Sequence, residues 1–148
     1  MSVYPTPKNF AVDVLRRLSK QQPHASKINR DGFPPGAEAI VVSRSGGICE
    51  LDSCGVADVL HHRRPRGAGG TSLAWVNQAA NAMHLSNECH LRVEGRLPDS
   101  SRHVSKVRGW LVSQNGTRTA VDVRVLYRGR WALLTDDGQV NPVKGGPA

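Results

Sequence analysis

The stretch from His61 to Glu94 constrains the fold more than any other part of this chain. It begins with His61 and His62, whose side chains would point to opposite faces of an extended segment because strand side chains alternate. It ends with His90 and Glu94, which lie one helical turn apart and would share one helix face. One of the paired histidines could therefore join His90 and Glu94 around a metal ion, while the other stays free for proton chemistry.

A basic, glycine-rich segment over residues 63–70 separates the two ends of this stretch. Its arginines Arg63, Arg64 and Arg66 are predicted to contact phosphate, because a guanidinium can bind two phosphate oxygens at once. The alternative is a solvated arginine cluster, which the position beside the histidines disfavours. The pattern thus predicts a metal-dependent site for a phosphodiester.

Composition limits the class of partner. With 148 residues, a net charge of +8 and a pI near 10.1, the sequence predicts one domain that binds a polyanion, either nucleic acid or an acidic membrane surface. The sequence lacks a long apolar run and an apolar leader, so we expect no membrane span and a cytoplasmic location. Three cysteines fit a reducing compartment, and an aromatic content of 5% disfavours single-strand binding by base stacking.

The order of these motifs resembles the HNH endonuclease family, whose catalytic unit is the ββα-metal fold. The resemblance rests on His61-His62, Arg-x-Arg-Gly-x-Gly-Gly, Asn81 and Cys89-His90. Asn81 precedes His90 by nine residues, which is also the family's interval between asparagine and final histidine. The segments 109–112 and 129–138 are similar to the tail of small phage-encoded members, and the resemblance covers about residues 38–140.

The resemblance implies an α+β protein with three parts. An N-terminal arm, short helix and loop would occupy residues 1–36, and a ββα-metal (HNH) core would occupy 37–97. A basic, β-rich C-terminal extension would occupy 98–148, where a surface that tracks duplex DNA is expected. Its members are Arg102, Lys106, Arg108, Arg118, Arg124, Arg128 and Arg130.

Local patterns place the core elements. An apolar stripe predicts a helix within 10–18, and residues 37–45 fit either helix or strand. A helix is preferred there, because Gly46-Gly47 resembles a C-cap and family members have a helix at this place. Strands are predicted over 56–62 and around 81–85. Ser86 should cap a helix that carries His90 and ends at Gly95.

The C-terminal part is predicted as a short helix within 101–108 followed by segments with strand character over 110–112, 121–126 and 131–134. Asn115-Gly116 and residues 136–138 indicate turns. The prolines and glycines of 141–148 predict a frayed end.

The family motif implies roles for the central residues. His61 would bind the catalytic metal and His62 would act as general base, while His90 would be a second ligand. Glu94 would be a third ligand, or alternatively would hold a ligand histidine in place. Asn81 would fix the loop around the base through its amide, and Asn77 is a rival for this role.

The cysteines raise the question of a structural zinc. Relatives often bind zinc through two cysteine pairs, whereas here Ser86 replaces one member and leaves Cys49, Cys54 and Cys89. Structural zinc normally requires four protein ligands, so the set is incomplete. Either His84 supplies the fourth ligand, or the thiols pack without zinc.

The sequence therefore predicts an HNH-type endonuclease that cleaves double-stranded DNA with a divalent ion, which could be Mg²⁺, Mn²⁺, Ni²⁺, Co²⁺ or Zn²⁺. By analogy, it would be phage-encoded, act in the host cytoplasm near the DNA-packaging terminase, and work as a monomer or dimer. The alternatives are a non-catalytic zinc-knuckle module that binds DNA, and a ribonuclease on the same scaffold.

Overall fold

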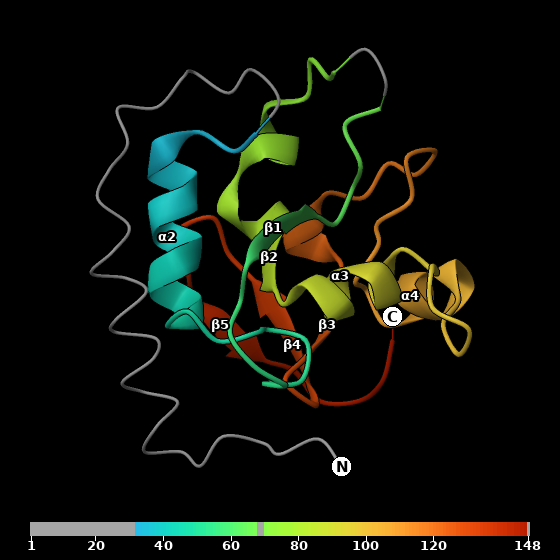
Figure 1. Ribbon diagram of the computed structural model, residues 1–148. Helices are drawn as coiled ribbons and strands as arrows, with labels where there is room; N and C mark the ends of the chain where they lie inside the picture. Colours follow the sequence, from blue (N-terminus) through green and yellow to red (C-terminus); the bar gives the residue numbers. More distant parts are fainter. Residues whose placement is uncertain (1–31, 68–69, 148) are drawn as a thin grey trace.

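The computed structural model describes residues 32–67 and 70–147, and the helix predicted within 10–18 lies outside these ranges. The described chain is a mixed α+β structure, which confirms the predicted fold class. It contains a two-stranded and a three-stranded sheet, both antiparallel, with short helices around them (Figure 1). No helix in the described part is long and apolar enough to cross a membrane.

The first sheet is a hairpin that presents the paired histidines. β1 (Val59–His62) pairs with β2 (Ala82–Leu85) in a register that sets His61 opposite Met83. Both strands are shorter than predicted, because Val56 forms only an isolated bridge and Asn81 ends a 3₁₀ helix. The connection between the strands carries 3₁₀ helices over Ala74–Asn77 and Ala79–Asn81.

The helix α3 (Asn87–Val93) follows β2 after a single residue. That residue, Ser86, accepts a hydrogen bond from the Cys89 amide at 3.2 Å, which confirms the predicted N-cap. The helix ends at Glu94, and Gly95 continues in the left-handed region with φ of 71°. His90 and Glu94 therefore project from the last turn of a short, well-capped helix.

The helix α2 (Pro35–Ser45) confirms the predicted helix and begins two residues earlier. Gly46 ends it with φ of 64°, and its amide donates to the Val42 carbonyl at 3.0 Å. The helix buries Val41 in a small apolar cluster with Phe33 and Ala82, and so packs on the strand hairpin.

A buried ion pair ties this helix to the rest of the molecule. Arg44 donates from Nε and Nη2 to the carboxylate of Glu50 at 2.6 and 2.8 Å. The other partners of Glu50 are the Tyr127 hydroxyl at 2.8 Å and the His84 amide at 2.8 Å. The carboxylate thus links α2, β2 and the second sheet, and burial beside it raises the pKa of Tyr127.

The C-terminal part forms the helix α4 and the second sheet. α4 (Arg102–Val107) confirms the short helix predicted within 101–108, and the Ser101 hydroxyl caps it. A 3₁₀ helix, Ala120–Asp122, precedes the second sheet. The strands of that sheet, in spatial order, are β3 (Val125–Tyr127), β4 (Arg130–Leu134) and β5 (Val140–Pro142).

Three expectations for this part are wrong. Residues 110–112 form no strand, because the amides of Trp110 and Leu111 both donate to the Ser105 carbonyl of α4. Only the Val112 amide has a distant partner, the Arg63 carbonyl. Residues 121–124 precede the strand instead of belonging to it, since the 3₁₀ helix takes part of them. The end predicted to fray begins with β5, whose Asn141 pairs with Leu133.

The main hydrophobic core draws on both sheets and on α3. It contains Met83 and Leu85 from β2, Val93 from α3, and Val125 and Leu134 from the second sheet. Segments predicted as nuclease core and as C-terminal extension therefore share one core. Its packing fixes the position of α3 relative to β1, and with it the distance between the histidines.

Candidate metal centre

His61, His90 and Glu94 come together at the junction of β1 and α3 and could hold a metal ion. Each offers a ligand atom, and these atoms all lie within 4.8 Å of one another. A Glu94 carboxylate oxygen is 3.8 Å from His61 Nδ1 and 4.0 Å from His90 Nε2. Two imidazoles and a carboxylate suit Mn²⁺, Ni²⁺, Co²⁺ or Zn²⁺.

The surroundings of His61 fit it for metal binding. Its side chain is 2% exposed, and its Nε2 lies 2.9 Å from the Trp110 carbonyl oxygen, which can only accept. The hydrogen therefore sits on Nε2, and the lone pair of Nδ1 faces Glu94 and His90. Burial lowers the pKa of His61 to about 4, so the imidazole is neutral at pH 7.

Glu94 has a second partner that the sequence did not suggest. Arg102, the first residue of α4, donates from Nη1 to a Glu94 oxygen at 2.9 Å. Gly95 permits this approach, because a Cβ at that position would lie 3.1 Å from the Arg102 side chain. The carboxylate is thereby held between α4 and the histidines.

His62 lies on the opposite face of β1 from His61. Its ring stacks on Phe33 with centroids 3.9 Å apart, and its Nε2 is 3.1 Å from the Asn77 amide oxygen. Since that oxygen accepts, Nε2 carries the hydrogen and Nδ1 keeps a lone pair. Burial lowers the pKa of His62, so the ring is a neutral base at pH 7.

Asn81 and Asn77 have different roles, although the sequence offered them as alternatives for one role, that of fixing the loop around His62. Asn81 is fully buried; its oxygen accepts from the Arg64 amide at 2.8 Å and its nitrogen donates to the Val76 carbonyl at 2.8 Å. It thus joins the ends of the loop between β1 and β2. Asn77 holds the His62 ring itself, a contact that no spacing in the sequence pointed to.

The three loop arginines differ in their surroundings. The Arg63 guanidinium is fully buried and donates to the carbonyls of Gly109, Ala80, Ala120 and Val123 at 2.8–3.1 Å. The predicted phosphate contact is therefore wrong for Arg63, because its side chain is fully buried and four of its five N–H donors bond to carbonyls inside the protein. Arg64 and Arg66 are partly exposed, and Arg64 lies over Trp75, 5.5 Å from the ring centroid.

A second group of metal ligands lies at the cysteines. Cys49, Cys54, Cys89 and Asp52 offer ligand atoms within 4.8 Å of one another, and these could also hold a metal ion. Asp52 occupies the fourth place instead of His84, whose Nδ1 is 2.7 Å from the Ser45 hydroxyl. The role considered for His84 is thus wrong, since its strand position points it at α2.

The thiols are close enough to share protons. Cys54 and Cys89 sulfurs are 3.0 Å apart, and the Ser86 hydroxyl is 3.3 Å from Cys54. The Cys89 thiol lowers the pKa of Cys49 to about 5, while burial raises the pKa of Cys54 to about 11. One thiolate among neutral thiols is therefore the expected state without a metal.

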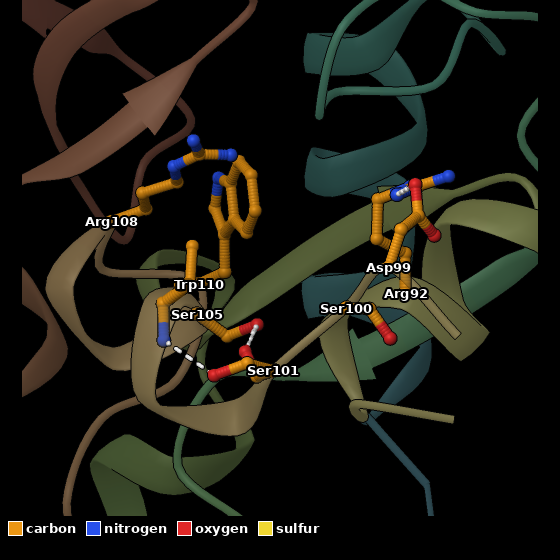
Figure 2. Close-up of a pocket in the computed structure, with 8 residues that line it drawn as sticks. Arg92, Asp99, Ser100, Ser101, Ser105, Arg108 and Trp110 are labelled. Atoms are coloured by element: carbon orange, nitrogen blue, oxygen red, sulfur yellow. Dashed lines mark hydrogen bonds and ion pairs between the residues drawn. The ribbon is translucent and has the colours of Figure 1, made fainter. Parts of the chain in front are cut away.

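A hollow of about 380 Å³ lies beside the metal centre, between α3 and α4 (Figure 2). On one side Arg92 pairs with Asp99 at 2.9 Å; on the opposite side Arg108 lies over Trp110, 5.0 Å from the ring centroid. The same Trp110 supplies the carbonyl that orients His61. Asp99 neutralises Arg92, whereas no described carboxylate forms an ion pair with Arg108, which also lines this hollow.

Comparisons with known proteins identify no relative: no family model, no curated protein and no solved structure matches this chain.

Proposed function

We propose that this protein is a metal-dependent endonuclease that hydrolyses phosphodiester bonds of double-stranded DNA, with a ββα-metal core of the HNH type. The observation that carries the proposal is the convergence of His61 Nδ1, His90 and Glu94 on one point. The neighbouring His62 is turned to the other face of the same strand and keeps its own lone pair. Ligand and base therefore do not compete for one ion.

A divalent ion at His61, His90 and Glu94 would supply Lewis-acid stabilisation for the charge that develops on the phosphate and on the leaving oxygen. His62 Nδ1 accepts the proton of the attacking water, whose oxygen bonds to phosphorus while the bond to the 3′ oxygen breaks, and the departing 3′ oxygen takes up a proton from solvent. Asn77 keeps the ring in the tautomer that this step requires. The products carry 5′-phosphate and 3′-hydroxyl ends.

Asn81 contributes by position alone. Its hydrogen bonds to Arg64 and Val76 hold the loop that follows His62, and a displacement of about 1 Å at a reacting group can cost on the order of 100-fold in rate. A net charge of +8 favours a polyanionic substrate, and both Arg64 and Arg66 stand beside His62 in the chain to meet its phosphates.

We also propose that the cysteine group binds a structural zinc with Cys49, Cys54, Cys89 and Asp52 as ligands. Four ligands from three thiols and a carboxylate complete a tetrahedral set. The low pKa of Cys49 supports this assignment, because zinc binds the thiolate. The ion would replace the contacts between the free thiols with metal–sulfur bonds, and the bond to Cys89 would fix the start of α3.

Plasmid cleavage tests the nuclease. Supercoiled DNA is incubated with the protein and Mg²⁺, Mn²⁺, Ni²⁺ or Zn²⁺, with and without chelator, and a parallel lane contains RNA. Nicked or linear DNA that requires metal supports the proposal. Binding without cleavage under every metal would leave a DNA-binding module, and cleavage of RNA alone would indicate a ribonuclease.

Two variants then separate the roles of the histidines, with His103→Ala on exposed α4 as the matched control. His61→Ala removes a ligand, so metal affinity and cleavage fall together. His62→Ala removes only the proton acceptor, so metal affinity stays while turnover falls by roughly 100-fold, the usual scale for loss of a general base. Calorimetric metal titration beside cleavage rates measures both, and loss of metal binding in His62→Ala alone would reverse the assignment.

A further inference from the structure

The cations of the C-terminal part differ in their partners. Arg102 is paired with Glu94, and Arg128 donates to the carbonyls of Ser45 and Ile48 at 2.7 and 3.0 Å. These two are committed to contacts within the protein. Positive charge without an acidic partner collects elsewhere in the C-terminal part.

It collects in a hollow of about 300 Å³ between α4, the segment 118–124 and the C-terminal tail. Lys106, Arg118 and Arg124 line this hollow together with Val107, Val123 and Pro147. No carboxylate of the described residues lines it, and none of the three cations forms an ion pair with a described acidic residue.

The two arginines are held in place by carbonyl groups, which leave their charge uncompensated. Arg118 donates to the Asp122 carbonyl at 2.7 Å, and Arg124 donates to the carbonyls of Lys144 and Gly146 at 3.3 and 3.0 Å. Three like charges around one hollow repel each other unless an anion is present. The hollow beside the metal centre differs, because Asp99 lies within it.

We propose that Lys106, Arg118 and Arg124 form a preorganised pocket for one backbone phosphate of the DNA substrate, a few nucleotides from the bond that is cut. This inference rests on the proposed nuclease function for its choice of polyanion. The backbone is read without regard to sequence, because the pocket offers charge and no groups arranged for base edges.

The geometry of α4 connects this pocket to the metal centre. Arg102, which contacts Glu94, and Lys106, which lines the pocket, are four residues apart on one face of α4. Four residues of helix rise about 6 Å, while each nucleotide of a duplex strand advances about 3.4 Å. A strand that crosses the metal centre along α4 therefore reaches the pocket within a few phosphates.

The test measures duplex affinity by fluorescence anisotropy over a series of salt concentrations, with chelator present so that no cleavage occurs. The variants are Lys106→Gln, the triple change of Lys106, Arg118 and Arg124 to Gln, and Arg92→Gln as the control, because Asp99 already neutralises Arg92. Lys106→Gln should weaken binding about two- to fivefold, the usual scale for an exposed ion pair. The triple variant should lower the log–log salt slope by about 0.9, as expected for one phosphate.

Two results would overturn the pocket: a salt slope of the triple variant equal to that of Arg92→Gln, or a fall of about 2.7 in the triple variant, which would mean three separate phosphates. The Lys106 side chain makes no hydrogen bond or ion pair with the described residues, so Lys106→Gln should fold even if the triple variant does not. Absence of duplex binding by the unmodified protein would also overturn it. If the protein binds duplex DNA through the pocket but cuts no plasmid, the pocket proposal stands and the nuclease proposal is refuted.

Discussion

Replacing Arg63 with leucine removes a guanidinium that donates to four backbone carbonyls from inside the protein. Each buried acceptor left without a donor costs about 1–3 kcal/mol, and the Ala120 carbonyl keeps the Val123 amide as a donor, so the other three at the lower end give about 3 kcal/mol. Burial lowers the pKa of Arg63 to about 9, which shows that desolvation opposes the charge and argues for the lower end. Because a domain is stable by about 5–15 kcal/mol, this change should remove a large share of the free energy of unfolding.

Urea unfolding followed by circular dichroism measures the loss, and Arg130→Leu on an exposed strand position is the control. With a typical urea dependence of about 2 kcal/mol per M, the midpoint should fall by about 1.5 M in Arg63→Leu and by less than about 0.3 M in the control. Arg63→Lys should lie between them, since an ammonium cannot reach all four carbonyls. Equal midpoints in Arg63→Leu and the control, with weakened DNA binding, would instead restore the phosphate role expected from sequence.

Three further outcomes follow from the two clusters. In chelated protein, the pKa of His61 is about 4 in the folded state and about 6.5 in the unfolded chain, so the unfolded chain binds the proton first as pH falls. The free energy of unfolding is therefore full above pH 6.5 and falls by up to about 3 kcal/mol as pH drops towards 4. The same urea midpoint at pH 7 and pH 5 would contradict this. Asp52→Ala should lower zinc content and thermal stability together, Ser86→Cys should restore zinc in that background, and stoichiometric zinc in Asp52→Ala would remove the carboxylate from the ligand set. Asn77→Ala should reduce turnover while leaving metal affinity unchanged, because it frees only the His62 ring, and an unaltered rate would show that the ring needs no such partner.

Local patterns in the sequence were sufficient to predict the helix ends and the faces on which the candidate ligands lie, because the causes of these features act over a few residues. The Ser86 hydroxyl caps α3 through an amide three residues away, and Gly46 ends α2 through its own left-handed backbone. The separation of His61 and His62 onto opposite faces follows from the alternation of strand side chains. The shared face of His90 and Glu94 follows from the helical repeat.

The tertiary structure alone decided which polar groups face which partners. Arg63 and Arg64 are adjacent and identical in type, yet one is buried because carbonyls from residues 17 to 60 positions away converge on it. The tautomer of His61 depends on the Trp110 carbonyl, 49 positions away. Such contacts depend on how the whole core packs, and no spacing within the sequence encodes them. The local pattern therefore determined the candidates, whereas long-range burial and hydrogen bonding assigned each of them its partner.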